Sequence, residues 1–328
     1  ALSIPLVSKI KKYLEDDKQV MLFINRRGYA PVYYCTECDW QSECTNCDSK
    51  LVYHRNINRL KCHHCGLEKP PETSCPSCNS QSLKILGYGT ERLEENLESY
   101  FPNSDVIRID RDTTRKKKAF TLHLEKINSG KPCIIVGTQM LAKGHDFSNL
   151  AFVGILDVDV GLMSLDYRAT EQLAQLLIQV SGRCGRGDYR GEVNIQTRYP
   201  HHPIFKFVRD SQYIEYAKTL LLEREEAQLP PYAPQALICA NSKNKNDAEN
   251  FLTEVAQLIN SIDIESIEIW GPVPGVIEKK SNYYYFNLYL QSKDRVQLHR
   301  LIKTFYKHIA TIKVNSSLRW FIDIDPIE

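Results

Sequence analysis

Eight cysteines gather in one short stretch of the chain, at a spacing that could hold metal ions. The sequence has 11 cysteines, and eight of them lie between Cys35 and Cys78 as four C-x-x-C pairs. A C-x-x-C turn brings two thiolates to one ion, while nearby backbone amides hydrogen-bond the sulfurs. Four such turns supply the ligands of two closed tetrahedral sites. The sequence therefore predicts a zinc-ribbon-like insert that holds two structural Zn²⁺ ions.

Sequence separation indicates how the four pairs combine. The two middle pairs are separated by 14 residues (48–61), close to the spacing of a zinc ribbon, and the other two pairs would nest around them. The inner cluster is then Cys44, Cys47, Cys62 and Cys65, and the outer cluster is Cys35, Cys38, Cys75 and Cys78. Pairing of adjacent turns, with Cys38 and Cys44 on one ion, is an alternative that spacing leaves open. Four matched pairs disfavour disulfides or simple buried thiols.

Composition and charge limit the classes of function. The chain has 328 residues, 42% hydrophobic and 25% charged, which is enough for two domains or more. A net charge of +2 gives no basic field over the whole chain, so contact with nucleic acid would depend on local patches such as RKKK (115–118). The sequence has no apolar run of about 18 residues and no secretory signal pattern. We therefore expect a cytoplasmic protein without membrane contact, whose reduced cysteines bind metal.

Strands and helices alternate on both sides of the cysteines. Strands are expected at Val20–Ile24, 83–86, 105–110, 133–138, 150–159 and 191–197, and helices at 91–101, 119–128 and 166–179. This alternation predicts an α/β fold with a parallel sheet that is covered on both faces. Such sheets bind ligands beyond the carboxyl ends of their strands. We therefore expect GTQMLAKGHDF (137–147) and SGRCGRG (181–187) in ligand-binding loops.

The end of the long helix carries a second group of residues that could do chemistry. Gln179 is followed by Gly182, Arg183 and Arg186 in the pattern Q-x-x-G-R-x-x-R. On a continuous helix, the two arginines would lie about one turn apart on the same face. Planar guanidinium groups suit phosphate oxygens and stabilise the charge on a transferring phosphoryl group. Surface ion pairs are the alternative interpretation of these arginines.

Longer segments resemble a known family. The segment from 136 to 187, VGTQMLAKGHDFSNLAFVGILDVDVGLMSLDYRATEQLAQLLIQVSGRCGRG, closely resembles the second motor lobe of the PriA family. These are superfamily 2 replication-restart helicases, also called primosomal protein N′. FINRRGYAP (23–31), the eight cysteines, GYGTER (87–92) and RIDRDTTR (108–115) match the family in the same order. The resemblance covers nearly the whole chain and implies that the parallel sheet belongs to a RecA-like helicase lobe.

The motifs of this family imply roles for single residues. FINRRG corresponds to motif IV and GTQMLAKGHDF to motif V. The resemblance implies that Arg26, Arg27 and Thr138 lie near the path of DNA. It also implies that Gly144 and Asp146 face the nucleotide cleft.

The third family motif, motif VI, corresponds to QVSGRCGR (179–186). The resemblance implies that Gln179, Arg183 and Arg186 serve the phosphates of ATP, with Arg186 as the arginine finger. Cys184 departs from the family, which usually has alanine at this position. A thiol between two arginines is expected to be acidified and sensitive to oxidation.

Two parts of an ATPase are missing from the sequence. It contains no G-x-x-x-x-G-K-[ST] phosphate loop and no acidic DExH strand end for magnesium, and in the family both belong to the first lobe. We therefore interpret the chain as the C-terminal part of an ATP-dependent 3′–5′ DNA helicase, inactive alone, that uses ATP and Mg²⁺ in the intact enzyme. The family recognises stalled or branched forks and initiates primosome assembly. Implied partners are branched and single-stranded DNA, single-strand-binding protein and helicase-loading proteins.

The C-terminal residues follow a pattern of their own. Strands are expected at 234–242, 265–272, 282–291 and 318–325, and helices at 247–261 and 294–309. That order, β-α-β-β-α-β, is typical of a ferredoxin-like α+β domain. Aromatic residues at Tyr283–Phe286, with basic residues nearby, could stack on exposed bases, although strand alternation buries about half of them.

These patterns predict three parts of the chain. They are a second RecA-like helicase lobe (1–34 and 79–222), a two-zinc insert (35–78) and a C-terminal α+β domain (223–328), with the proline-rich QLPPYAP (228–234) near the last boundary. The alternative from another functional class is a zinc-dependent nucleic-acid-binding module without a motor. The presence of a phosphate-loop lobe in the intact protein would discriminate between the two.

Overall fold

The chain forms two compact units. The first comprises residues 1–30 and 87–219, and the second comprises residues 31–86 and 220–328. A computed structural model describes residues 2–25, 32–54, 57–86, 90–110, 117–138, 141, 147–164, 166–185, 190–262, 264 and 267–327. Within those ranges, each helix is too short or too polar to span a membrane. The predicted three-part division stays a prediction.

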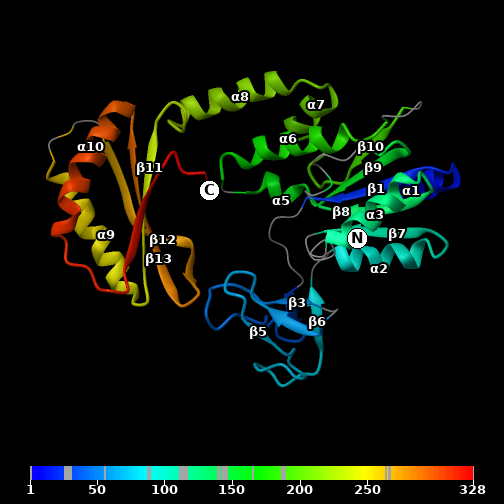
Figure 1. Cartoon of the computed structure of the whole chain (residues 1–328), viewed down its shortest axis with the longest axis horizontal. Helices are drawn as coiled ribbons and strands as arrows, with labels where there is room; N and C mark the ends of the chain where they lie inside the picture. Colours follow the sequence, from blue (N-terminus) through cyan, green and yellow to red (C-terminus); the bar gives the residue numbers. More distant parts are fainter. Residues whose placement is uncertain are drawn as a thin grey trace. The chain divides into compact units, whose positions relative to one another are not determined.

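The first unit is built on a five-stranded parallel sheet with the order β10-β9-β1-β8-β7 (Figure 1). Its strands are β1 (Gln19–Ile24), β7 (Asp105–Ile109), β8 (Cys133–Gly137), β9 (Leu150–Leu156) and β10 (Glu192–Ile195). Every residue of β1, β8 and β9 is buried. A parallel strand in the middle of a sheet is covered on both faces, which explains these continuous apolar runs. The predicted α/β fold with a parallel sheet is confirmed.

Helices of the first unit cover this sheet. They are α1 (Ile4–Glu15), α2 (Thr90–Tyr100), α3 (Lys117–Asn128) and α6 (Ala169–Ser181), and α5 (Asp159–Leu162) and α7 (Pro203–Arg209) pack on α6. Helix α8 (Tyr213–Glu226) begins in the first unit and ends in the second. Leu6 and Ile10 of α1 lie one turn apart and pack on Leu22 of β1 in a core that α2 also enters. Phe23 points to the opposite face and is also fully buried. The buried stripe of α6, which includes Leu173 and Leu177, packs against β9.

The cysteine insert forms an antiparallel sheet with the order β5-β4-β3-β2-β6. Its strands are β2 (Val32–Cys35), β3 (Val52–His54), β4 (Arg59–Lys61), β5 (Glu68–Lys69) and β6 (Leu83–Leu86). The assignment of 83–86 to the parallel sheet is therefore wrong, because β6 pairs with β2 in the register Cys35 to Leu83. A short apolar run shows that a strand exists but does not specify its partner.

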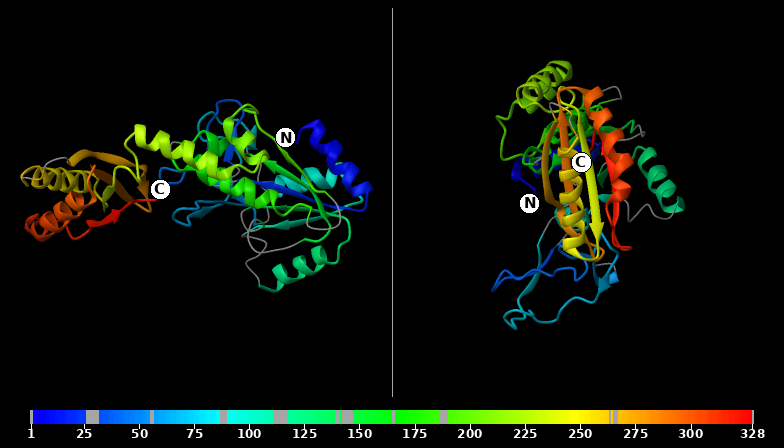
Figure 2. Two further views of the ribbon diagram at one scale, coloured as in Figure 1. Left: turned by 90° about the horizontal axis from the view of Figure 1, so that it is seen from above. Right: turned by 90° about the vertical axis from the view of Figure 1, so that its left-hand side faces the viewer.

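The C-terminal domain has its elements in the predicted β-α-β-β-α-β order. They are β11 (Gln235–Ser242), α9 (Lys245–Asn260), β12 (Ile267–Lys280), β13 (Tyr283–Ser292), α10 (Arg295–His308), the 3₁₀ turn η2 (Ile309–Thr311) and β14 (Arg319–Ile324). The sheet is antiparallel with the order β12-β13-β11-β14. Both helices pack on the same face of the sheet (Figure 2). The core between the helices and the sheet includes Phe286, Leu288 and Phe305.

Strand β12 is longer than the sequence predicts. The expected strand ends at residue 272, because the prolines and glycines of GPVPG (271–275) are typical of a turn. In the structure the pairing with β13 shifts register twice and continues to Lys280 opposite Tyr283. The result is a long hairpin that ends in a turn at Ser281 and Asn282.

Candidate functional site

The eight cysteines of the insert lie in two groups of four. The sulfur atoms of the inner cluster all lie within 4.8 Å of one another, and so do those of the outer cluster. This is the nested arrangement that the spacing predicts. The alternative in which adjacent turns share an ion is wrong, since Cys38 and Cys44 belong to different groups.

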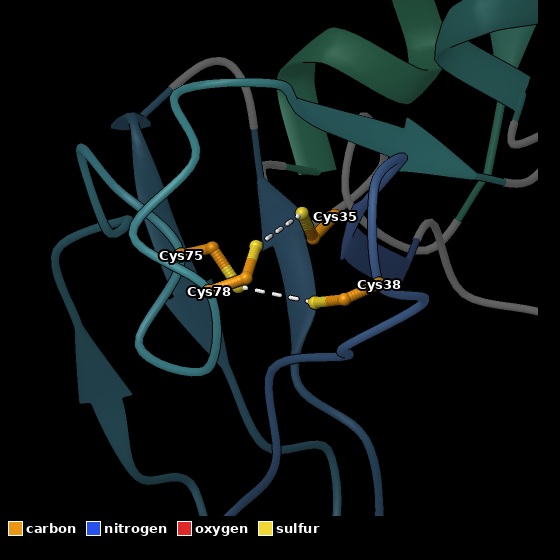
Figure 3. Close-up of side chains that lie close together, drawn as sticks. All are labelled: Cys35, Cys38, Cys75 and Cys78. Carbon is orange, nitrogen blue, oxygen red and sulfur yellow. Dashed lines mark hydrogen bonds between the residues drawn. The ribbon is translucent and has the colours of Figure 1, made fainter.

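The distances between the sulfur atoms fit a tetrahedral zinc ion. The Sγ atoms of Cys35 and Cys78, of Cys38 and Cys75, and of Cys44 and Cys65 are each 3.6 Å apart. Four sulfurs at the Zn–S distance of about 2.3 Å would be separated by about 3.8 Å. Figure 3 shows the outer cluster, in which Cys75 and Cys78 face Cys35 and Cys38 across the space that an ion would fill.

Backbone amides support the sulfurs at both clusters. The N–H of Asn46 donates to Cys44 Sγ, and the N–H of Ser77 donates to Cys75 Sγ, both at 3.4 Å. Burial raises the pKa of the Cys62 thiol, but hydrogen bonds, mainly from Ser49 and from the backbone of the same knuckle, outweigh it and lower the pKa to about 6. These hydrogen bonds favour the thiolate form of Cys62, which is the form that binds a metal ion.

The two clusters differ in burial. Cys44, Cys47 and Cys62 are buried, and the inner cluster packs with Leu51 and Leu60, which are fully buried. In the outer cluster, Cys38 and Cys78 are exposed. The inner cluster is therefore part of the small core of the insert, and the outer cluster opens to solvent.

The histidines beside the inner cluster are not part of it. His63 and His64 are exposed, as the sequence suggests for knuckle residues. The ring of His63 stacks on that of His54, with the two Nε2 atoms 3.0 Å apart. Four thiolates already complete each group, so neither site has an open position for catalysis.

The segment QVSGRCGR does not continue as a helix to its end. Helix α6 stops at Ser181, and Arg183 lies in the turn that follows. The expectation of two arginines on one helix face is therefore wrong. Gly185, with a φ of +72°, takes the left-handed conformation that a tight change of direction requires. Arg183 is half-buried in this turn, while Gln179 is exposed on the last turn of α6.

Backbone contacts fix the turn against the sheet. The N–H of Gly185 donates to the carbonyl of Leu150, at 3.1 Å, and the thiol of Cys184 donates to the carbonyl of Glu192, at 3.4 Å. Leu150 and Glu192 are the first residues of β9 and β10. The turn therefore lies at the amino ends of these strands. The expectation that SGRCGRG lies beyond the carboxyl ends is wrong, because α6 carries the chain back across the sheet.

Glu192 also anchors the start of β10 to α1. Its carboxylate lies 2.8 Å from Lys9 Nζ and accepts a hydrogen bond from Tyr13 Oη at 3.0 Å. The hydrogen bond from Lys9 is the main reason that the pKa of Glu192 is lowered. Burial, together with the hydrogen bond to Glu192, raises the pKa of Tyr13 to about 12.

Cys184 is not an acidified thiol. Burial is the main cause that raises its pKa to about 11. The expectation of an acidified thiolate is therefore wrong, because burial, together with the negative charge of Glu192, favours the protonated thiol. The residue acts as a small, half-buried hydrogen-bond donor instead.

The residues that the family motifs single out fall at different edges of the sheet or outside the described ranges. Thr138 directly follows β8, at its carboxyl end, and its carbonyl accepts a hydrogen bond from Leu141. The turn that contains Arg183 lies at the opposite, amino edge. Five of the predicted site residues lie outside the described ranges: Arg26, Arg27, Gly144, Asp146 and Arg186.

Sequence reasoning missed Gly191 and the polar residues of the amino edge. A Cβ atom on Gly191 would lie 2.5 Å from Cys184 Sγ and 2.6 Å from the Gly185 nitrogen, so this glycine lets the turn approach β10. A glycine just before a strand is the only signal for such an approach. Asn149 is a polar residue at the same amino edge. Its side-chain Nδ2 donates hydrogen bonds to the carbonyls of Asp17 and Gly130, at 2.9 and 2.7 Å.

Three protein families match separate parts of the chain. The primosomal protein N C-terminal domain matches residues 225–327. The Cys-rich region of the PriA DNA helicase matches residues 44–70, and the helicase conserved C-terminal domain matches residues 77–188. The matched ranges include the inner cluster, Thr138 and the turn after α6.

Whole-chain relatives agree with these matches. The replication restart protein PriA of Haemophilus influenzae is 44% identical over 325 residues, which is 99% of this chain and 44% of that protein. PriA of Bacillus subtilis is 34% identical over 324 residues, 99% of this chain and 40% of that protein. The chain thus spans less than half the length of the curated relatives it matches.

Proposed function

Because this chain belongs to the PriA family of replication restart proteins, we propose that it forms the C-terminal part of an ATP-dependent 3′–5′ DNA helicase that acts at stalled or branched replication forks. In this proposal the first unit is the second of two motor lobes. It supplies one side of an ATP cleft, and the sequence that holds the phosphate loop and the magnesium ligand supplies the other.

The observation that carries the proposal is the turn after α6. Its position is fixed at three points, by the hydrogen bonds of Cys184 and Gly185 and by the close approach of Gly191. Such a turn can present arginine side chains to phosphate oxygens with little further ordering. Arg183 lies in this turn, and Arg186 follows one residue after Gly185 in the sequence.

The two edges of the sheet suit two different ligands. The turn with Arg183 lies at the amino ends of β9 and β10, and Thr138 lies at the carboxyl end of β8. We assign the amino edge to ATP and the carboxyl edge to DNA, and we propose that Arg26 and Arg27, which follow β1 in the sequence, also contact DNA. Closure of the cleft on DNA would then bring the arginines to the γ-phosphate.

We assign a structural role to the two cysteine clusters. Each offers four sulfur ligands and no open position, so the zinc ions would stabilise the insert rather than activate water. The insert would act as a wedge or docking surface. Its loss would therefore reduce DNA unwinding and the loading of partner proteins more than ATP turnover. Single-strand-binding protein and helicase-loading proteins are the partners that we propose, in the cytoplasm.

Photoaffinity labelling tests the assignment of the α6 turn. We expect an ATP analogue with a photoreactive group on the γ-phosphate to label the peptide that contains residues 182–190, when it is bound to the full-length protein with single-stranded DNA. Excess ATP should remove the label. Gly191→Ala should lower the labelling because its methyl group would displace the turn.

The matched control for that experiment is Cys184→Ala. It removes only the thiol hydrogen bond and keeps the backbone of the turn, so the labelling should stay close to that of the unmodified protein. Labelling confined to other peptides, and unaffected by Gly191→Ala, would contradict the assignment of this turn to the nucleotide. The binding-module alternative would then be favoured.

A further inference from the structure

The turn of the β12–β13 hairpin contacts the inner cysteine cluster. The backbone N–H of Ser281 donates to Cys47 Sγ at 3.1 Å, although the two residues are 234 positions apart in the sequence. This donor comes from the C-terminal domain, whereas the N–H donors to Cys44 and Cys75 come from their own C-x-x-C knuckles. Among the described residues, the outer cluster receives no hydrogen bond from the C-terminal domain.

Four more hydrogen bonds hold the hairpin at this position. Asp48 and Lys279 form a reciprocal pair: the Asp48 N–H donates to the Lys279 carbonyl at 2.8 Å, and the Lys279 N–H donates to Asp48 Oδ2 at 2.7 Å. The Asn282 N–H donates to the Asn46 carbonyl at 2.8 Å, and Lys279 Nζ donates to the Thr45 carbonyl at 3.2 Å. The hairpin thus forms hydrogen bonds with four consecutive residues, 45–48, at the C-x-x-C knuckle of Cys44 and Cys47.

The conformation of the turn makes these donors available. Ser281 and Asn282 have φ values of +54° and +63°, the pattern of a two-residue type I′ turn, and they connect Lys280 to Tyr283. The N–H groups of these two turn residues do not take part in the pairing of β12 with β13. They therefore point out of the hairpin and can bind an external acceptor.

We propose that this hairpin turn is an outer-shell support of the inner zinc site, so that the bound ion and the C-terminal domain hold each other in place. An N–H group that donates to a zinc thiolate orients the sulfur and stabilises its negative charge. The knuckle keeps its shape only while its sulfurs converge on one ion. Metal binding and hairpin docking are therefore linked, and each strengthens the other by the same factor.

The linkage predicts which variants will lose zinc from the inner cluster. Asn282→Val places a β-branched residue at positive φ and should open the turn, whereas Asn282→Gly keeps a residue that adopts this φ freely. Asp48→Ala removes the acceptor of the Lys279 N–H, and Asp48→Asn keeps an oxygen there. Each disruptive variant thus has a matched control on the same residue.

The measurement is site-resolved zinc release from the zinc-loaded chain. A chelator is added with iodoacetamide, and mass spectrometry records which cysteines become alkylated over time. With Asn282→Val or Asp48→Ala, we expect the inner cysteines to be alkylated about tenfold faster, the lower range for lost outer-shell partners, and the outer cysteines at an unchanged rate. Asn282→Gly and Asp48→Asn should behave like the unmodified chain.

Three results would overturn the proposal: an unchanged alkylation rate of the inner cysteines, an equal acceleration at both clusters, or an equal effect of Val and Gly at position 282.

Hydrogen exchange supplies the reciprocal test. In Cys62→Ser, the amide protons of Ser281 and Asn282 should exchange faster than in the unmodified chain, and an unchanged rate would also contradict the linkage. The proposal rests on the assignment of zinc to the inner cluster. Failure of the linkage can be distinguished from failure of that assignment, because an unmodified chain without zinc would refute the metal assignment itself.

Discussion

Replacing Arg186 by alanine in the full-length protein should lower DNA-stimulated ATP hydrolysis by about 10³-fold or more, the effect of losing an arginine finger. The guanidinium would contact the γ-phosphoryl group mainly in the transition state, so turnover should fall far more than nucleotide affinity. Hydrogen bonds of Cys184 and Gly185 fix the turn that precedes this residue in the sequence. The measurement is steady-state hydrolysis with single-stranded DNA, together with a nucleotide binding titration.

Lysine at the same position should not restore activity. One ammonium group cannot reproduce the planar fork of a guanidinium. The affinity for DNA and the zinc content serve as internal controls, since neither depends on this residue in our account. Normal DNA-stimulated hydrolysis by Arg186→Ala would mean that QVSGRCGR is not part of a motor.

The second large effect concerns the metal content. Elemental analysis should find two zinc ions per chain, and about one in each of two single variants, Cys62→Ser and Cys75→Ser. The two variants should lose different ions, since Cys62 and Cys75 belong to different clusters. Apparent binding free energies of structural zinc reach about 10–16 kcal/mol, so the loss of either ion should loosen its part of the insert.

The consequences of the two cysteine variants should differ. Loss of the inner ion removes the group that organises Leu51 and Leu60, so Cys62→Ser should make the insert sensitive to proteases. Loss of the outer ion, where Cys38 and Cys78 are exposed, should leave this small core in place. Finding one ion in the unmodified chain, or the same ion lost in both variants, would contradict the nested arrangement.

The features that the sequence predicts well are those that depend on local spacing. Four C-x-x-C pairs predict two metal clusters, because metal ligands must converge on a single point, and the separation of the pairs favours the nested grouping that the structure shows. The apolar runs of β1, β8 and β9 indicate central parallel strands for a similarly local reason. The order of elements in the C-terminal domain follows from its alternating periodicities.

The features that the sequence does not predict depend on contacts between distant segments. Nothing near Leu83 specifies that β6 pairs with β2, and nothing near Ser281 indicates that its N–H reaches Cys47. The helix predicted at 166–179 ends close to the end of α6 at Ser181, but the placement of Arg183 and Arg186 on one helix face is wrong because both residues follow that end in the sequence. The high pKa of Cys184 follows from burial in a turn whose packing partner, Gly191, cannot be identified from spacing.

The most direct test of the central claim is ATP hydrolysis by this chain alone, compared with the full-length protein under the same conditions. Half of a cleft should give no turnover above background with single-stranded DNA, whereas the full-length protein should hydrolyse ATP. The isolated chain should still bind single-stranded DNA, with an affinity that falls as salt rises, which shows that it is folded and that its phosphate contacts remain. Turnover well above background by the chain alone would contradict the claim that it contributes one lobe of a two-lobed ATPase.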